Sequence, residues 1–224
     1  MDKQQIVVDH IGPEREPVIV IDNFAADPNQ LREFALRQPF VPAGRHYPGV
    51  KADLPPHYFN NHGSVLATLA RDVFKLLKPL RVLESRFSVV TTPASALSIE
   101  QRLPHIDAVD SGRLALIHYL VPGGTTGTAF YRHRSTGFAT VNTERAAIYL
   151  ASLNSELHAN GLPDPAYPSG DTALFECLKE YPGRYNRALL YRSSFLHSGV
   201  ISASDNVAKN PALGRLTVTG FFTT

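Results

Sequence analysis

Short runs in which apolar residues dominate or alternate with polar residues fill most of the chain after residue 80. These runs are rich in β-branched and aromatic residues, and most are separated by Gly, Pro, Ser or Asn. Closely spaced strands with such residues between them are typical of a β-sandwich or barrel. We therefore predict strands in the segments VLESRFSVV, RLALIHYLV, GTAFYRH, TALFECLKEY, RALLYR, FLHSGV and RLTVTGFF.

The first 80 residues have a different pattern. EPVIVIDNF is predicted to be a strand, and DPNQLREFALRQ is predicted to be a helix with Asp27 as N-cap and Pro28 as its first residue. A second helix is predicted in SVLATLARDVFKLLKP and ends at Pro79. Between the two helices lies FVPAGRHYPGVKADLPPHYF, which we interpret as a long loop with a role in binding.

One helical segment interrupts the β-rich part, TERAAIYLASLNSELHANG, and Gly161 closes it. We expect one domain over residues 1–224, with an N-terminal strand and helices in 1–80, a β core in 81–224 and the helical insertion at about 142–161. The predicted class is α+β and mainly β, with the N-terminal helices packed on the core.

Composition narrows the function classes. The 224 residues have a formal net charge of +2 and no long run of one sign, so we expect no nucleic-acid or membrane partner. The lone cysteine, Cys177, excludes an intrachain disulfide and is interpreted as a buried, inert thiol. No signal peptide or membrane-spanning run is evident, and we expect a cytoplasmic protein.

The segment RLPHIDAVD contains the first candidate metal ligands, His105 and Asp107. Side chains at positions i and i+2 of an extended segment point to the same side. With a second histidine they would form a 2-His-1-carboxylate triad, which leaves coordination positions open on Fe(II). His197, at the end of an apolar strand, is the candidate for that histidine. The alternatives are a polar pair in a surface loop and a strand-end histidine bonded to a backbone carbonyl.

The last predicted strand, GRLTVTGFF, carries Arg215 and Thr217 on one face. A buried arginine is costly unless it meets an anion. A guanidinium with a hydroxyl two residues away can bind a carboxylate through a fork and one more hydrogen bond. The alternative is an internal pair with an aspartate or glutamate.

The order of these motifs, PHID, YLVPGG, YNRALLY, LHSG and GRLTVTGFF, resembles the 2-oxoglutarate/Fe(II)-dependent dioxygenases over about residues 81–224. The similarity is to prolyl-hydroxylase-like members and to an unassigned bacterial subfamily. It implies a double-stranded β-helix (jelly-roll, cupin-like) fold. It also implies an enzyme that uses Fe(II), 2-oxoglutarate and molecular oxygen to hydroxylate an unactivated C–H bond of a small molecule, amino acid or peptide.

The same resemblance implies site residues. Fe(II) would be bound by His105, Asp107 and His197, and Arg215 would hold the distal carboxylate of 2-oxoglutarate. Thr217 matches the small hydroxyl residue two positions after that arginine. Tyr119 or Tyr131 could assist.

Several alternatives stay open. Arg192 is the other candidate for the cosubstrate anchor, because the segment between His197 and Arg215 is longer than in many relatives. A jelly-roll binding protein without catalysis, or a cupin-type metalloenzyme that does not use 2-oxoglutarate, would share the fold. The Arg, His and Tyr residues of AGRHYPGV and FYRHRSTGF favour an anionic substrate.

Among the other histidines, we expect His118 in the core and His133 exposed or facing the substrate. We expect His46 and His62 near loops that line the pocket.

Overall fold

Two antiparallel sheets form the centre of the fold. The computed structural model describes residues 3–44, 46–123, 126–201 and 210–224. Within these ranges, one sheet has the strand order β1-β2-β9-β6-β11-β5-β4-β3 and the other has the order β10-β7-β8. The strands are β1 (Gln5–Ile11), β2 (Glu16–Asp22), β3 (Val41–Pro42), β4 (Gly49–Asp53), β5 (Arg81–Val90), β6 (Leu114–Tyr119), β7 (Gly127–His133), β8 (Phe175–Tyr181), β9 (Ala188–Arg192), β10 (His197–Val200) and β11 (Leu216–Thr223).

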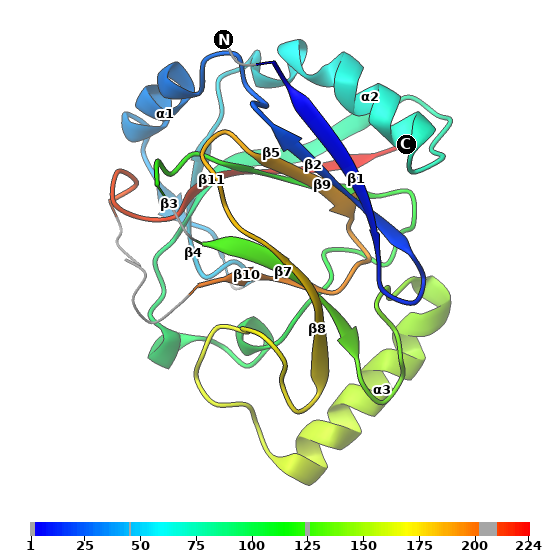
Figure 1. Cartoon of the computed structure of the whole chain (residues 1–224). Helices are drawn as coiled ribbons and strands as arrows, with labels where there is room; N and C mark the ends of the chain where they lie inside the picture. Colours follow the sequence, from blue (N-terminus) through cyan, green and yellow to red (C-terminus); the bar gives the residue numbers. More distant parts are fainter. Residues whose placement is uncertain (1–2, 45, 124–125, 202–209) are drawn as a thin grey trace.

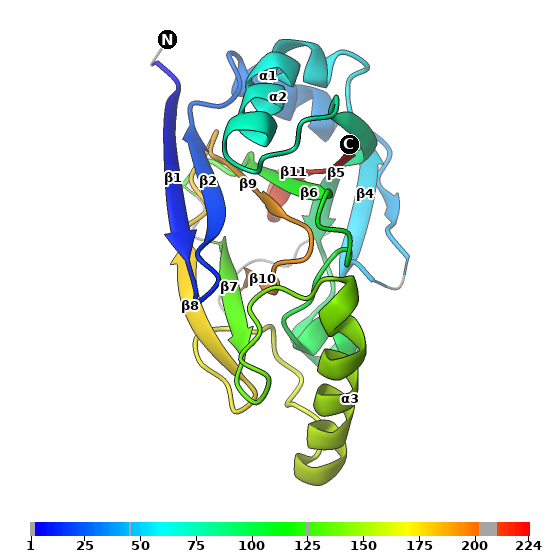
Figure 2. The same cartoon turned by 90° about the vertical axis from the view of Figure 1, so that its right-hand side faces the viewer.

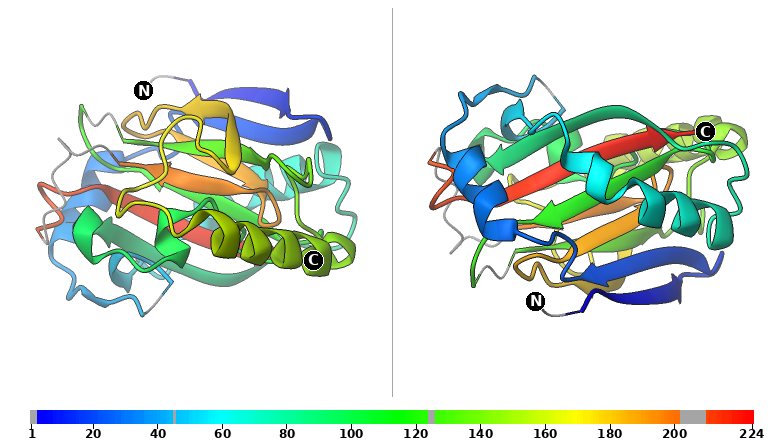
Figure 3. Two further views of the ribbon diagram at one scale, coloured as in Figure 1. Left: turned by 90° about the horizontal axis from the view of Figure 1, so that it is seen from below. Right: turned by 90° about the horizontal axis from the view of Figure 1, so that it is seen from above.

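Helices cover the outer face of each sheet. Helices α1 (Pro28–Leu36) and α2 (Gly63–Asp72) lie over the large sheet, and α3 (Thr143–Asn160) lies beside the small sheet (Figures 1 and 2). Seen from below, α3 and β8 are in front, and seen from above, α1 and α2 are in front (Figure 3). Short 3-10 turns complete the described structure: η1 (Tyr58–Asn61), η2 (Ala94–Ala96) and η3 (Glu100–Arg102).

Apolar side chains pack in three layers that match this arrangement. The first layer joins α1 and α2 to the large sheet, through residues such as Leu66, Phe74 and Leu216. The second lies between the sheets and includes Phe130 and Tyr191. The third joins the small sheet to α3 and includes Tyr131, Tyr149, Leu153 and Phe175.

The alternation of side chains along a strand therefore separates two roles in the large sheet. In β11, Leu216, Val218 and Phe222 pack in the layer beneath the helices. Because successive side chains point to opposite faces, Arg215 and Thr217 face the space between the sheets. This confirms the predicted division of faces in the last strand.

The chain crosses repeatedly between the two sheets. After β5 in the large sheet, His105 forms an isolated antiparallel bridge with His197 of β10. The chain then returns to the large sheet in β6, passes through β7 and β8 of the small sheet, and alternates through β9, β10 and β11. The mainly-β antiparallel architecture with N-terminal helices is confirmed.

Local signals place several elements where the sequence predicts them. Asp27 caps α1, its Oδ1 accepting a hydrogen bond of 2.9 Å from the backbone nitrogen of Gln30, and Pro28 is the first helical residue. Gly161 ends α3 with a φ of 84°, a conformation that favours glycine. All the strands predicted after residue 80 are present, as is the strand in EPVIVIDNF.

Three segments differ from the prediction. The segment QIVVDHI forms β1, an edge strand paired with β2, which was not among the predicted strands. The segment interpreted as one long loop contains β3 and β4, and β4 pairs with β5. Helix α2 ends at Asp72, well before Pro79, because Lys75 is left-handed at a φ of 60° and Phe74 turns into the core.

Within the described part of the chain, no helix is both long enough and apolar enough to cross a membrane. The cytoplasmic location stays a prediction.

His118 is a core residue beneath η1, as expected. It is fully buried on the helix side of β6, with Nδ1 3.0 Å from the Tyr58 hydroxyl and Nε2 3.0 Å from Asn186 Oδ1. Asn186 Oδ1 can only accept, so Nε2 carries the proton and Nδ1 accepts from Tyr58. Burial lowers the pKa of His118 to about 3, so the folded protein keeps this ring neutral.

This burial predicts a dependence of stability on pH. Between the folded pKa of about 3 and the ordinary value of 6.5, the unfolded chain binds one more proton at His118 than the folded chain. The stability contribution is therefore fully present above pH 6.5 and is lost as the pH falls toward 3. In His118→Gln the slope of unfolding free energy against pH should be smaller by up to about 1.4 kcal/mol per unit in this window. Denaturant titrations from about pH 4 to pH 7 measure this slope. The exposed His46→Gln is the control, and an unchanged slope in His118→Gln would contradict the assignment.

Candidate metal centre

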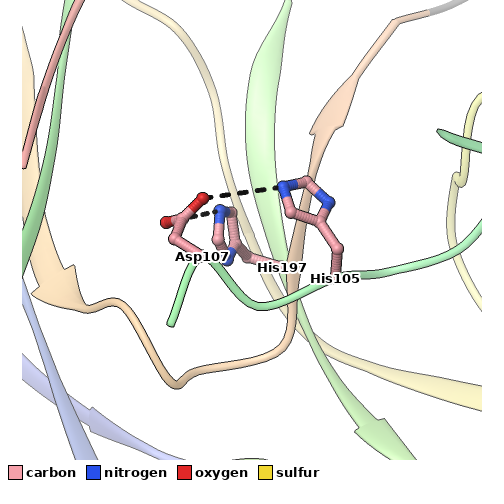
Figure 4. A group of neighbouring side chains, drawn as sticks. All are labelled: His105, Asp107 and His197. Atoms are coloured by element: carbon pink, nitrogen blue, oxygen red, sulfur yellow. Dashed lines mark ion pairs between the residues drawn. The ribbon is translucent and has the colours of Figure 1, made fainter. Parts of the chain in front are cut away.

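The structure brings His105, Asp107 and His197 together (Figure 4). His105 and Asp107 lie in the extended segment before β6, and His197 is the first residue of β10. The backbone N–H of His105 donates to the carbonyl of His197, and the N–H of His197 donates to the carbonyl of His105, each at 2.9 Å. One ligand atom from each side chain lies within 4.8 Å of the others, so the three converge on one point.

The side-chain geometry leaves the ligand atoms free. His105 Nε2 is 3.9 Å from Asp107 Oδ1, and His197 Nε2 is 3.5 Å from Asp107 Oδ2. His197 Nδ1 donates to the Phe195 carbonyl at 2.8 Å, which fixes the proton on Nδ1 because a carbonyl only accepts. The predicted alternative, a bond from His197 to a backbone carbonyl, is therefore present. It uses Nδ1, so the Nε2 lone pair of His197 points toward Asp107 and is free to bind a metal.

The electrostatics of the triad fit a cation. Asp107 Oδ2 is buried and has no hydrogen-bond partner among the described residues. Burial raises the pKa of Asp107 to about 6, against the opposing effects of His105, Arg113 and Lys51. Burial lowers the pKa of His197 to about 4, so this histidine is neutral at pH 7. A divalent ion would give the orphaned oxygen a partner, and two imidazoles with one carboxylate suit Fe(II) and similar metals.

His105 forms the outer side of the centre. About half of its side chain is exposed, at 51%, whereas the side chain of His197 is 5% exposed. Desolvation and the neighbouring His197 lower the pKa of His105, and Asp107 opposes them. The site is therefore reached from the His105 side, with His197 as its floor.

Arg215 faces the same inter-sheet space. Its side chain is buried, and Nη2 donates to the Gly127 carbonyl at 3.0 Å. Its Nε is buried without a hydrogen-bond partner, and no carboxylate of the described residues pairs with it. Arg215 therefore does not form the alternative that the sequence left open, an internal ion pair with an aspartate or glutamate of the described residues.

Gly199 lies next to the Arg215 guanidinium. A Cβ at Gly199 would lie 3.7 Å from Arg215 Nη2, so the two side-chain positions face each other across the space. Gly199 is two residues after His197, which places Arg215 about 6.6 Å further along β10 than the metal ligand. Arg215 and the triad are therefore parts of one site.

Hydroxyl groups surround Arg215. Thr217 is fully buried, and its Oγ1 donates to the Ser88 carbonyl at 3.4 Å. The Tyr47 hydroxyl is buried without a hydrogen-bond partner among the described residues. Burial raises the pKa of Tyr47, while the nearby Arg215 charge and the Thr217 and Ser88 hydroxyls lower it. Sequence reasoning missed Tyr47 as a site residue, although it lies in the AGRHYPGV segment that was assigned to binding.

The two tyrosines proposed from the sequence have different surroundings. The Tyr119 ring lies 5.5 Å from the Arg215 guanidinium carbon, and its hydroxyl is 2.7 Å from Thr128 Oγ1. Tyr119 therefore lies beside Arg215. Tyr131 lies in the layer between the small sheet and α3, and the structure does not bring it to the site. A bulge between Phe130 and Tyr131 places Phe130 in the inter-sheet layer and Tyr131 on the opposite face.

Arg192, the rival anchor, lies on the helix side of the large sheet. Its Nε is 2.8 Å from Glu16 Oε1, and its Nη2 donates to the Phe74 carbonyl at 2.8 Å. Nη1 also donates to the Ser111 carbonyl. These bonds satisfy the guanidinium and tie the end of α2 to the sheet, which leaves Arg215 as the anchor candidate.

The FYRHRSTGF segment has a structural role. His133 is buried, not exposed, with Nε2 2.8 Å from Glu156 Oε2 of α3. Arg132 pairs with Glu176, and Arg134 pairs with Asp171 at 3.0 Å. The prediction that His133 is exposed or faces the substrate is therefore wrong.

The remaining singled-out residues lie away from the triad. His62 stacks on Phe24 beneath the helices, with ring centroids 4.2 Å apart, so it does not line the metal centre. His46 is exposed. Cys177 is half-buried on β8, and burial together with Glu180 and Asp171 raises the pKa of its thiol, as suits an inert cysteine.

Comparison with known proteins identifies the family. A model described as a family of unknown function, DUF6445, matches residues 2–222. The chain belongs to the DUF6445 family. No curated protein matches the sequence of this DUF6445 protein.

Solved structures resemble the fold of this DUF6445 protein. HygX from Streptomyces hygroscopicus with nickel and 2-oxoglutarate bound has a TM-score of 0.51 and 15% identity, covering 93% of this chain and 83% of that chain. The non-heme α-ketoglutarate-dependent carbocyclase SnoK from nogalamycin biosynthesis has a TM-score of 0.51 and 14% identity, covering 93% and 79%. The fold is therefore similar to that of 2-oxoglutarate-dependent enzymes.

The triad predicts how metal content responds to substitution. Wild type is expected to bind one divalent metal per chain under anaerobic conditions with Fe(II). His105→Ala and His197→Ala should each lose most of it, because two ligands hold the ion far less tightly. Metal analysis by mass spectrometry tests this. His133→Gln is the matched control, since His133 is also a buried histidine near a carboxylate. Equal metal content in all four proteins would contradict the assignment of His105 and His197 as metal ligands.

Substitution of Asp107 should remove the metal but stabilise the metal-free protein. Asp107→Asn should abolish metal binding and raise the unfolding temperature of the metal-free protein. The amide removes a buried charge whose pKa burial raises to about 6, so a gain on the order of 1–3 kcal/mol is expected at pH 7. Thermal unfolding in the presence of a chelator measures it. A metal-free Asp107→Asn that unfolds below wild type would contradict the description of Asp107 as an unpaired buried carboxylate.

Proposed function

We propose that this protein is an Fe(II)- and 2-oxoglutarate-dependent oxygenase, built as one domain on a double-stranded β-helix core. One observation carries the proposal. A three-residue metal site with an orphaned carboxylate oxygen shares the inter-sheet space with Arg215, a buried guanidinium that has no carboxylate partner among the described residues.

The strand order supports the double-stranded β-helix. From β5 onward the chain passes back and forth between the two sheets. In place of a fourth strand of the small sheet, the chain has a one-residue bridge at His105, which pairs with His197 of β10. The order β9-β6-β11-β5 then faces β8-β7-β10 and His105. Each sheet interleaves strands from the two ends of the core, as a jelly roll does.

The three side chains would hold the iron. His105 and His197 would bind through Nε2, and Asp107 would bind through a carboxylate oxygen. The Phe195 carbonyl orients the His197 ring by holding its Nδ1 proton. When bound, the iron and 2-oxoglutarate would activate molecular oxygen, which supplies the oxidising power for attack on a C–H bond that side chains alone do not have.

Arg215 would bind the distal carboxylate of 2-oxoglutarate. Its orphaned Nε and the orphaned Tyr47 hydroxyl provide two donors, and the Thr217 hydroxyl lies beside them. Gly199 leaves room between the guanidinium and the metal ligand. The spacing of about 6.6 Å along β10 suits a short dicarboxylate whose other end reaches the metal.

Hydroxylation is the proposed outcome. Asp107 provides the third protein ligand, and the site retains the full 2-His-1-carboxylate set that such chemistry uses. The buried aromatic layer around Phe130 and Tyr191 excludes water from one side of the site. A binding protein without catalysis would not need the triad, and a cupin-type enzyme without 2-oxoglutarate would not need Arg215.

The decisive test concerns Arg215. Arg215→Met should weaken 2-oxoglutarate binding about ten- to a hundredfold while iron binding persists, because a charge-assisted contact contributes roughly 1.5–3 kcal/mol. Arg215→Lys keeps the charge but loses the fork and should fall between wild type and Arg215→Met. Anaerobic titration of 2-oxoglutarate into the iron form, followed by the metal-to-ligand charge-transfer band, measures the affinity.

Arg192→Met is the matched control. It should reduce stability, since it leaves Glu16 unpaired, but it should bind 2-oxoglutarate as wild type does. The proposal fails if Arg215→Met folds, binds iron and takes up 2-oxoglutarate with wild-type affinity.

Tyr47 gives a second, smaller prediction. Tyr47→Phe removes one neutral donor and should weaken 2-oxoglutarate binding by about three- to tenfold. The same titration measures this effect. Tyr131→Phe is its control, because that hydroxyl is also buried and unpartnered but lies on the far face of the small sheet. Equal losses in the two variants would show that Tyr47 acts only through packing.

A further inference from the structure

We propose that the substrate carries a carboxylate beside an apolar body, and that Arg113 binds this carboxylate. The inference rests on the proposed function, since it concerns the substrate of the same site. Arg113 lies outside AGRHYPGV and FYRHRSTGF, the segments whose composition predicted an anionic substrate.

Arg113 differs from most other shielded arginines of the described residues in having no carboxylate partner. Arg187, Arg192 and Arg145 each bind a carboxylate, those of Asp22, Glu16 and Glu14 respectively. Arg113 Nε is buried without a hydrogen-bond partner among the described residues, and its charge acts on Asp107 without an ion-pair contact. A shielded, unpaired guanidinium is an unfavourable arrangement that an arriving anion would relieve.

The backbone fixes Arg113 beside the metal centre. The Ser193 carbonyl accepts hydrogen bonds from the backbone nitrogen of Asp107 at 2.8 Å and from that of Ala108 at 3.2 Å. The Ser193 N–H donates to the Arg113 carbonyl at 2.9 Å. Ser193 thus holds the metal-ligand segment on one side and Arg113 on the other. Its own Oγ is buried and unpartnered.

Side-chain alternation directs Arg113 into the inter-sheet space. Leu114 packs beneath the helices, whereas Ala115 and Tyr119 pack between the sheets. Arg113 has the same parity as Ala115, and its guanidinium carbon lies 5.6 Å from the Phe221 ring centre. Phe221 packs against the inter-sheet layer as well.

A partly exposed apolar surface adjoins this cation. Ile117 and Phe221 keep part of their surface open, although both lie in central strands whose other residues are mostly fully buried. Between them, Thr219 is also partly open, and its Oγ1 is 2.9 Å from Ser88 Oγ. A ligand whose apolar body covers Ile117 and Phe221 would bring its anionic end to Arg113.

Two other described cations on this side are already paired. Lys51 Nζ is 3.1 Å from Glu84 Oε1, and Arg86 pairs with Asp53. Arg215 is committed to the cosubstrate in the proposed function. Among the described residues, Arg113 is therefore the cation that remains for the substrate, and a carboxylate matches the fork of its donors.

The test compares carboxylic acids with their primary amides. The probes are a panel of straight-chain and phenylalkyl carboxylic acids, each paired with its amide, added to the anaerobic protein loaded with Fe(II) and 2-oxoglutarate. Binding is measured by calorimetry and by the perturbation of the charge-transfer band. Wild type is expected to bind at least one acid about tenfold or more tightly than its amide, which has the same shape but no charge.

Variants then assign the preference to Arg113. Arg113→Met should bind acid and amide equally, and Arg113→Lys should keep part of the preference. Arg86→Met, which removes a nearby arginine already paired with Asp53, should keep all of it. If Arg113→Met keeps the acid preference, or if wild type prefers no acid over its amide, the inference is overturned.

The charge-transfer band separates this outcome from a failure of the proposed function. Wild type that forms no band with 2-oxoglutarate contradicts the oxygenase itself. Wild type and Arg113→Met that both form the band, without any acid preference in wild type, contradict only the role of Arg113. The acid–amide comparison in wild type holds even if one variant fails to fold.

Discussion

The site depends on two reciprocal backbone hydrogen bonds between His105 and His197. These residues are far apart in the sequence, and each N–H donates to the other's carbonyl at 2.9 Å. Residues that exchange both bonds in an antiparallel pair have side chains on the same side of the strands. The imidazole rings therefore meet, with centroids 4.6 Å apart, and Asp107 follows two positions later on the same side. Without this bridge the three ligand atoms would have no common point.

The same region gathers polar groups that the fold leaves unsatisfied. Asp107 Oδ2, Arg215 Nε, Arg113 Nε and the Tyr47 hydroxyl are all buried without partners among the described residues. Each lowers the stability of the ligand-free protein, because a desolvated polar group loses its bonds to water. Most other shielded arginines have carboxylate partners, so this concentration marks the space between the sheets as the place where ligands complete the structure.

Much of this could be predicted from the sequence. Period-two alternation predicted the strands of the core and the shared face of Arg215 and Thr217. The capping signals of Asp27 and Gly161 predicted helix ends, since both act through neighbouring backbone. The His-x-Asp spacing in an extended segment predicted two ligands on one side, and the structure adds His197 to them.

The rest depends on contacts between distant residues. Strand β1 is largely exposed, and it forms through pairing with β2 and through Asp9, which binds Lys179 at 2.7 Å on β8. Tyr131 and His133 face α3 because of a bulge and an ion pair to Glu156. Tyr47 reaches the site because β4 pairs with β5, in a segment whose Gly and Pro residues suggested a loop. Local patterns carry no information about such pairings.

The two faces of the large sheet have consequences for how this protein can diverge. Leu114, Leu116, Leu216 and Val218 pack under the helices and bear the folding free energy, whereas Arg113, Ile117, Thr219 and Phe221 point the other way. A substitution at the second set alters the ligand environment without opening a cavity beneath the helices. Selection for substrate specificity and selection for folding thus act on alternate residues of the same strands. A lineage could acquire a new substrate by changing every second residue while its scaffold drifts independently.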